Sequence, residues 1–331
     1  MQGSSSTVWR PNSAVLGQSP WSSLSVAVAS RTMEVLRTPD EYFDNLPGYA
    51  YTPKYFELEE HDNLRMHYVD EGPHKGRVIL MLHGEPSWSY LYRNMIPIVA
   101  EAGYRAIAPD LVGFGRSDKP TKASDYSYQL HEEWLTSFVR GMNLKNIVLV
   151  CQDWGGLLGL RLVARYPELF SAVIAANTFL PTGKEPVGVT LAKWRLYSQE
   201  NAEFKISQVI ERGCDTGLSD QVRGAYDAPF PDESYKAGAR QFPMLVPTEP
   251  DCPAGVVNAE LWGALSDFDK PFVTAFSDGD PITAGADKVL QSKIAGADNR
   301  KHVTIKGGGH FLQEDRGPEL AKVVLDVANA L

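Results

Sequence analysis

The sequence predicts an α/β fold with a mostly parallel, doubly wound sheet and a helical insertion late in that sheet. Short apolar runs, such as residues 78–82 and 172–176, alternate with stretches whose apolar residues have helical spacing. This alternation stops at about residue 179 and resumes at about 271. Between these points, helical stretches alternate with segments rich in Pro and Gly, and no strand is predicted.

Each core element follows from its own local pattern. Residues 56–59 and 64–69 alternate apolar and polar side chains around a turn at 61–63, which predicts an antiparallel hairpin at a sheet edge. The wholly apolar run 78–82 predicts a buried central strand. By the same criteria, further strands are expected at 104–108, 146–150, 172–176, 271–276 and 302–305. Helices are expected at 94–102, 127–142, 287–294 and 318–331.

The domain limits follow from where the patterning changes. A chain of 331 residues can hold one large domain with an insertion. Residues 33–178 and 263–331 are assigned to the core, and residues 179–262 to a helical cap over the carboxyl ends of the strands, where ligands bind in such sheets. Residues 1–32 are rich in Ser and contain no Asp or Glu, which predicts a disordered extension, with Met33 as an alternative start of the protein.

Composition excludes several classes of protein. The net charge is -9 and there is no dense basic run, which argues against a nucleic-acid partner. The three cysteines form no C-x-x-C pair and the histidines show no H-E-x-x-H spacing, so we expect no metal site. No apolar run reaches the ~18–20 residues that cross a membrane. We therefore expect a cytoplasmic protein; the apolar stretch at 24–29 is only a weak sign of an export signal.

The stretch 148–156 carries the strongest functional signal. An apolar strand runs into Gln152 and Asp153, two glycines follow after Trp154, and an apolar helix comes next. Such a strand, tight turn and helix form the nucleophile elbow of α/β-hydrolases, which has Ser at the centre of G-x-S-x-G. Here the central residue is Asp153, so the nucleophile would be a carboxylate. The simpler alternative is that Asp153 only caps the helix.

Other loops that follow predicted strands carry matching residues. They are 83–90, 110–118, 278–281 and 307–310. Polar residues at the carboxyl ends of parallel strands converge in space, and the order acid, acid, histidine matches a nucleophile, an orienting acid and a base. Asp153 and His310 fill the first and last roles, while Asp278 and Asp280 compete for the second.

An aspartate nucleophile suits a particular reaction. Its ordinary pKa of about 3.9 means that it needs no base for activation, and its attack on a saturated carbon leaves an alkyl ester. His310 would activate the water that hydrolyses this ester, and the backbone N–H groups of Glu85 and Trp154 would bind the oxyanion. A halide leaving group gains little from protonation, so a weak donor such as the indole N–H of Trp154 suits it.

Three stretches carry a family resemblance. Residues 83–93, 110–120 and 152–156 resemble the haloalkane dehalogenases, and the likeness extends over about 35–331. The run 83–93 resembles the subfamily whose second halide-binding residue is a Trp in the cap, which implies Trp194. Some relatives have an Asn where this chain has Glu85, whose own side chain could be charged and salt-bridged or could bind a water. The family pattern also favours Asp280 over Asp278.

The resemblance implies hydrolysis of a small halogenated hydrocarbon, with water, to a primary alcohol and halide. It implies no cofactor, and we expect a monomer or weak oligomer. One alternative is an epoxide hydrolase with the same nucleophile and with Tyr197, Tyr226 and Tyr235 as cap donors. Another is a non-catalytic scaffold that binds a small ligand, which predicts a missing triad member.

Overall fold

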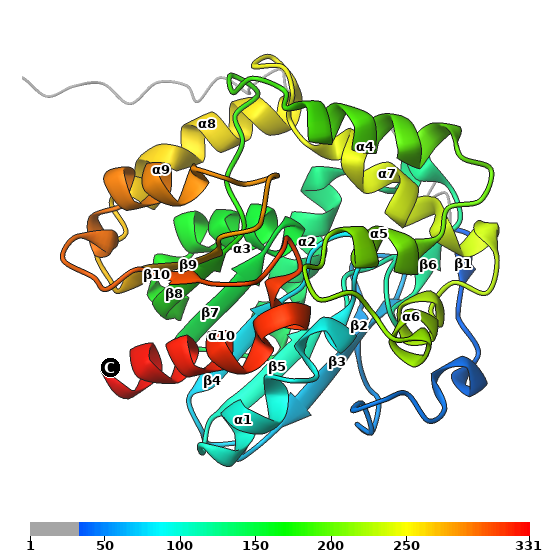
Figure 1. Cartoon of the computed structure of the whole chain (residues 1–331), viewed down its shortest axis with the longest axis horizontal. Helices are drawn as coiled ribbons and strands as arrows, with labels where there is room; N and C mark the ends of the chain where they lie inside the picture. The colour runs from blue at the N-terminus through cyan, green and yellow to red at the C-terminus, as the bar shows by residue number, and fades with distance from the viewer. Residues whose placement is uncertain (1–32) are drawn as a thin grey trace, which may run out of the picture. The chain divides into compact units, whose positions relative to one another are not determined.

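The computed structural model describes residues 33–331, so the predictions for residues 1–32 lie outside it. An eight-stranded sheet with the strand order β10-β9-β8-β7-β4-β5-β3-β2 runs through this part of the chain (Figure 1). The strands from β10 to β5 in this order are all parallel, whereas β3 pairs antiparallel with β5 and with the edge strand β2. The predicted mostly parallel sheet with an antiparallel hairpin at its edge is confirmed.

Every predicted strand is present, with ends within two residues of those expected. Their bounds are β2 (Lys54–Leu58), β3 (Leu64–Glu71), β4 (Val78–Leu82), β5 (Arg105–Pro109), β7 (Ile147–Gln152), β8 (Phe170–Ala176), β9 (Phe272–Ser277) and β10 (Val303–Ile305). All residues of β4 and β7 are buried. These two strands lack a polar face because helices cover both sides of a parallel sheet.

The helices of the core lie against this sheet. They are α1 (Ile96–Glu101), α2 (Tyr128–Gly141), α3 (Trp154–Arg165), α9 (Ala286–Lys293) and α10 (Leu312–Asn329). The side chain of Ser127 caps α2 by accepting a hydrogen bond from the N–H of Leu130. The last helix begins six residues before the expected start at Pro318, because an extra turn precedes a kink with non-helical backbone angles at Arg316.

The segment that joins β8 to β9 is described in full, and it contains helices but no strand. It contains α4 (Val189–Glu200), α5 (Ile206–Arg212), α6 (Asp220–Asp227), α7 (Ala237–Leu245) and α8 (Pro253–Ser266). Helices α4 and α7 pack against each other, and α8 packs on α3 of the core (Figure 1). The predicted helical insertion is present. Its limits as a domain remain a prediction, and α8 runs through the proposed boundary at 262/263.

Some short elements were not predicted. Strand β1 (Val35–Leu36) pairs antiparallel with β6 (Lys119–Pro120) and ties the start of the described chain to the loop after β5. The 3-10 helices are η1 (Asp40–Phe43), η2 (Ser89–Tyr92), η3 (Ala123–Asp125), η4 (Pro167–Leu169), η5 (Glu233–Lys236) and η6 (Ala295–Ala297). These pieces are too short to show a periodic apolar pattern.

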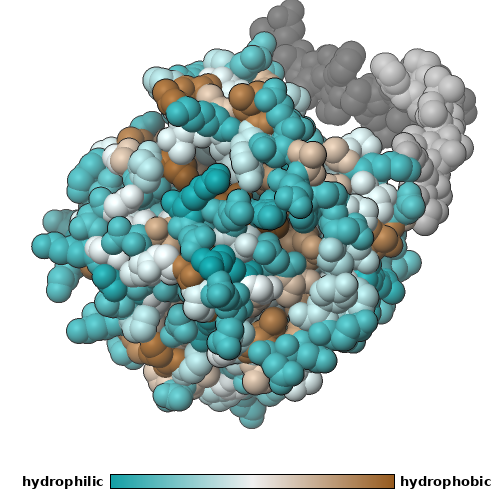
Figure 2. Space-filling model, turned by 45° about the vertical axis from the view of Figure 1, so that its right-hand side comes forward, coloured by the Kyte–Doolittle hydropathy of each residue, from teal (hydrophilic) through white to brown (hydrophobic). Residues whose placement is uncertain are grey.

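The surface mixes polar and apolar side chains. On the face shown in Figure 2, hydrophobic residues are interspersed among hydrophilic ones. Among residues 33–331, no helix is long and apolar enough to span a bilayer.

Candidate active site

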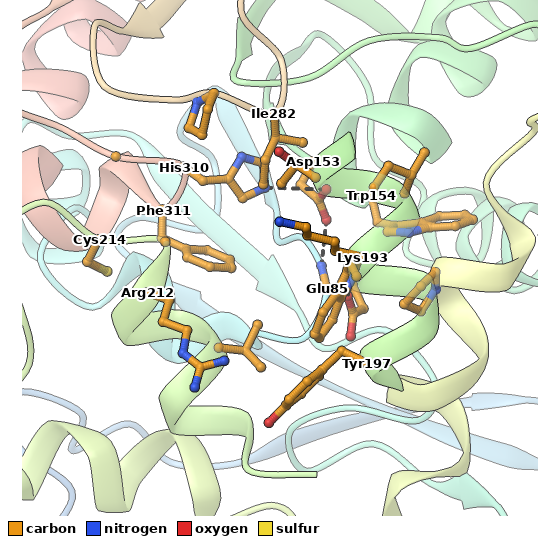
Figure 3. Close-up of a pocket in the computed structure, with 18 of the residues that line it drawn as sticks. Glu85, Asp153, Trp154, Lys193, Tyr197, Arg212, Cys214, Ile282, His310 and Phe311 are labelled. Atoms are coloured by element: carbon orange, nitrogen blue, oxygen red, sulfur yellow. Dashed lines mark hydrogen bonds and ion pairs between the residues drawn. The ribbon is translucent and has the colours of Figure 1, made fainter. Parts of the chain in front are cut away.

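Asp153 occupies the turn between β7 and α3. Its backbone angles are φ 49° and ψ -125°, a conformation that non-glycine residues rarely adopt. A side chain at Gly155 would collide with the carbonyl oxygen of Leu82, and one at Gly156 would collide with the Thr178 hydroxyl. The glycines therefore let α3 start directly against the neighbouring strands, and the tight turn leaves the Asp153 carboxylate facing the cavity (Figure 3).

His310 lies between two carboxylates. Its Nε2 is 3.5 Å from Oδ2 of Asp153, and its Nδ1 is 3.1 Å from Oδ2 of Asp280 (the first contact is drawn in Figure 3). The Nδ1 contact is an ion pair whose alignment is poor for a hydrogen bond, since Nδ1 has no well-aligned partner among residues 33–331. The structure thus brings together the acid, acid and histidine that the sequence placed in three separate loops.

The two candidate orienting acids have different surroundings. Asp280 faces His310 and also accepts hydrogen bonds from the N–H of Ile282 and the side chain of Thr283. Asp278 points elsewhere, because its Oδ1 accepts the N–H of Gly307 at 2.8 Å. Asp280 is therefore the carboxylate that contacts the imidazole.

His310 and its two neighbouring carboxylates stabilise each other's charged forms. Burial alone would lower the pKa of His310, but Asp280 and Asp153 outweigh it and raise the pKa to about 10. Burial would raise the pKa of Asp280, yet His310 and the hydrogen bonds from Thr283 and Ile282 lower it to about 2. In the free protein, the two carboxylates therefore favour the protonated form of His310.

The loop after β4 supplies a backbone donor to the nucleophile. The N–H of Glu85 donates to Oδ1 of Asp153 at 2.7 Å. His83 holds this loop with both ring nitrogens: Nδ1 donates to the Gly84 carbonyl, and Nε2 accepts the N–H of Leu111. His83 therefore holds the loop through contacts with the backbone. The N–H of Trp154 lies in the first turn of α3, where backbone N–H groups have no partner within the helix.

The two tryptophans proposed to bind halide have different surroundings. Trp154 lines the cavity and packs on Tyr128 and Phe242, with ring centroids 5.0 and 4.6 Å away. Trp194, on α4, lines the same cavity, but its indole N–H donates to Oε2 of Glu85 at 3.1 Å. The Glu85 side chain, whose role the sequence left open, is hydrogen-bonded to a cap tryptophan.

These residues surround one cavity of about 610 Å³. Asp153 and His310 both line it, and its lining is largely apolar. Lys193 on α4 and Arg212 at the end of α5 also line it (Figure 3). The volume lies within the range of pockets that enclose small organic molecules.

Comparisons with known proteins show the family of this chain. Residues 77–317 match the family model described as the alpha/beta hydrolase fold. The chain is 54% identical over 295 residues to a haloalkane dehalogenase of Psychrobacter cryohalolentis, which covers 88% of this chain and 97% of that relative. It is 46% identical over 301 residues to a haloalkane dehalogenase of Mycolicibacterium paratuberculosis, covering 90% and 100%. The chain belongs to the haloalkane dehalogenase family.

A solved structure supports this assignment. The tetrameric haloalkane dehalogenase from Paraglaciecola agarilytica NO2 matches with a TM-score of 0.83 and 37% identity, over 89% of this chain and 98% of that one. The predicted family, the α/β-hydrolase fold and the enzyme class are confirmed.

One polar residue beside the candidate site was not predicted from the sequence. Asn177, directly after β8, is fully buried and donates from Nδ2 to the carbonyl oxygens of Gly309 and His310. Its own carbonyl accepts the N–H of Asp153. It therefore joins the nucleophile turn to the histidine loop. A polar residue at the carboxyl end of a strand was the available signal, and the same signal marked the other loops.

Proposed function

We propose that the chain hydrolyses haloalkanes to primary alcohols and halide through an alkyl ester on Asp153. The observation that carries this proposal is an aspartate on a strained elbow, 3.5 Å from an imidazole, in the lining of a largely apolar cavity. Relatives of this chain are named haloalkane dehalogenases.

In the first step, a carboxylate oxygen of Asp153 attacks the carbon that bears the halogen. The new C–O bond forms as the carbon–halogen bond breaks, and the halide leaves with the electron pair. The indole N–H groups of Trp154 and Trp194 are the proposed donors to that halide. Trp154 lines the cavity, so its indole is available to a halide bound there.

In the second step, His310 takes a proton from water, and the hydroxide attacks the carboxyl carbon of the ester. The N–H groups of Glu85 and Trp154 stabilise the resulting oxyanion. The intermediate then collapses, and the alkoxide takes the proton from His310 and leaves as the alcohol. The carboxylic acid that remains on Asp153 passes its proton to His310, which restores the carboxylate. Formation of the ester removes one of the two charges that raise the pKa of His310. The imidazolium then releases its proton to solvent, and the neutral ring can act as the base.

Epoxide hydrolysis by the same nucleophile has less support. Of the three candidate tyrosine donors, Tyr197 lines the cavity, whereas Tyr235 does not. Tyr226 is buried and its hydroxyl donates to Glu314 at 2.6 Å. A pair of tyrosines directed at a substrate oxygen is therefore not formed by these residues.

For the whole protein, we propose a cytoplasmic monomer or weak oligomer that acts on small halogenated hydrocarbons. The Paraglaciecola relative is a tetramer, so assembly is a real alternative. Light scattering coupled to size-exclusion chromatography decides between them, and a stable tetramer at micromolar concentration would contradict the proposal.

The mechanism is tested by trapping the ester. The variant His310→Phe should accumulate the alkyl adduct when given 1-bromobutane, because it keeps the nucleophile but lacks the base. Peptide mass spectrometry should place one butyl group on Asp153. The double variant Asp153→Asn/His310→Phe is the control and should stay unmodified. An unmodified single variant, alongside an active wild type, would refute the covalent mechanism.

A further inference from the structure

The side chain of Glu85 has surroundings that the mechanism above does not use. The residue is buried, at 5% exposure, and lines the catalytic cavity. Its Oε2 accepts the Trp194 indole N–H, while its Oε1 is buried without a hydrogen-bond partner among residues 33–331. The N–H proposed for halide is thus already occupied by a carboxyl group in this structure.

This carboxyl group lies in a site that disfavours its charge. Asp153 and His310 act on it electrostatically, and Lys193, Arg212 and Asp215 line the same cavity. Within residues 33–331, the one hydrogen-bond partner of the Glu85 carboxyl is Trp194, and none of the cationic side chains donates to it. Burial and the nearby Asp153 carboxylate raise the pKa of Glu85 well above its usual range. This environment favours the uncharged form of the Glu85 side chain.

The Trp194 ring is held in place without Glu85. It stacks on Tyr197 and Phe204, with ring centroids 5.8 and 5.4 Å away and interplanar angles of 20° and 28°. The stacking fixes the position of the Trp194 ring. The Glu85 carboxyl accepts the indole N–H but does not hold the ring in place.

We propose that Glu85 is a positioning residue that competes with halide for the Trp194 indole N–H. Without halide, the carboxyl accepts this N–H, so the indole donor of Trp194 has a partner. When halide is present, the N–H transfers from the carboxyl to the anion. Each halide must displace this hydrogen bond to gain its own, so Glu85 weakens halide binding and speeds product release. The proposal rests on the halide role proposed for Trp194.

The test compares bromide binding in two variants of Glu85. Glu85→Gln keeps a neutral acceptor of the same length, and its dissociation constant for bromide should stay within threefold of the wild type. Glu85→Met removes the acceptor but keeps an unbranched chain, and it should bind bromide about three- to tenfold more tightly, the worth of one hydrogen bond. Quenching of Trp fluorescence gives the affinities, and stopped-flow measurements should show slower bromide release from Glu85→Met.

A double-mutant cycle assigns the effect to Trp194. In the Trp194→Phe background, Glu85→Met should no longer tighten bromide binding, because the contested N–H is gone. Thermal unfolding of every variant shows that it is folded. A Glu85→Gln variant that binds bromide ten times more tightly than wild type would show a repelling charged carboxylate and overturn the proposal. Unchanged or weaker binding by Glu85→Met would also overturn it.

Bromide binding distinguishes a wrong role for Trp194 from a wrong role for Glu85. If Trp194→Phe binds bromide as well as wild type does, the halide role of Trp194 is wrong and the role of Glu85 falls with it. If Trp194→Phe loses affinity while both Glu85 variants match wild type, only the competition by Glu85 is wrong.

Discussion

Two aspartates in one loop show how strongly a role depends on local contacts. Asp280 lies 3.1 Å from the imidazole of His310, while Asp278 accepts a hydrogen bond from the N–H of Gly307. The sequence could not separate them by residue type, and only the family pattern favoured Asp280. The structure separates them by direction: one carboxylate is turned toward His310 and the other away from it.

The variant Asp280→Asn should lower kcat by about 10²- to 10⁴-fold, because the imidazolium formed during ester hydrolysis loses its partner. Bromide should still appear in an initial burst of one equivalent, followed by slow turnover. The matched control Asp278→Asn should retain a kcat within a few-fold of wild type. Rapid-quench measurements of bromide release test both variants, and equal losses in the two would contradict this assignment.

Protonation of His310 should depend on the charge of the nucleophile. With both carboxylates present, its pKa is raised to about 10, so the ring stays protonated at pH 8. Asp153→Asn removes one of these charges, as the ester does, and should lower the pKa of His310. NMR titration of 15N-labelled histidine measures the shift. A ring that titrates at the same pH in both proteins would contradict the proposed switch from cation to base.

Whole elements differ in how far the sequence predicts them. The buried strands and the elbow were predicted because their signals are local: continuous apolar runs, and a polar residue followed by glycines. The first turn of α10 was missed because Pro318 suggested the start of the helix. The β1–β6 pairing and the Glu85–Trp194 hydrogen bond join residues far apart in the chain. No pattern within a short window encodes such contacts.

The helix that starts at the elbow should tolerate no side chain at Gly155. Gly155→Ala would push α3 away from the backbone at Leu82, so we expect a loss of about 1–3 kcal/mol in the free energy of unfolding and a large loss of activity. In α6, a side chain at Gly224 meets no atom within 4 Å, so Gly224→Ala should stabilise the protein by up to about 1 kcal/mol. Denaturant unfolding and halide release measure both. Equal stability of the two variants would contradict the packing argument.

The whole molecule buries several ionisable groups, and these should shape its stability in acid. Burial lowers the pKa of His131 to about 3. Asp110 and Asp280 have pKa values lowered to about 2, by His67 and His310 respectively, despite their burial. The aspartates are more acidic when folded, so their stabilisation is present above about pH 4 and is lost only as the pH falls toward 2. At milder pH, the buried neutral histidines lower the stability as the pH falls, while Glu85, whose pKa is raised in the folded chain, acts in the opposite direction.

Between pH 6.5 and 4.5, the unfolded chain binds a proton at His131 that the folded chain does not. The free energy of unfolding should consequently fall as the pH is lowered, by at most about 1.4 kcal/mol per pH unit for this residue. The His131 ring packs on Phe242 and Trp134, with centroids 4.3 and 4.8 Å away, so His131→Phe keeps an aromatic ring there. This variant should show a shallower slope in urea unfolding across that range, whereas His74→Asn, at an exposed position, should not. If the pH dependence of the free energy of unfolding is the same in His131→Phe as in wild type, folding does not lower the pKa of His131 and the prediction is wrong.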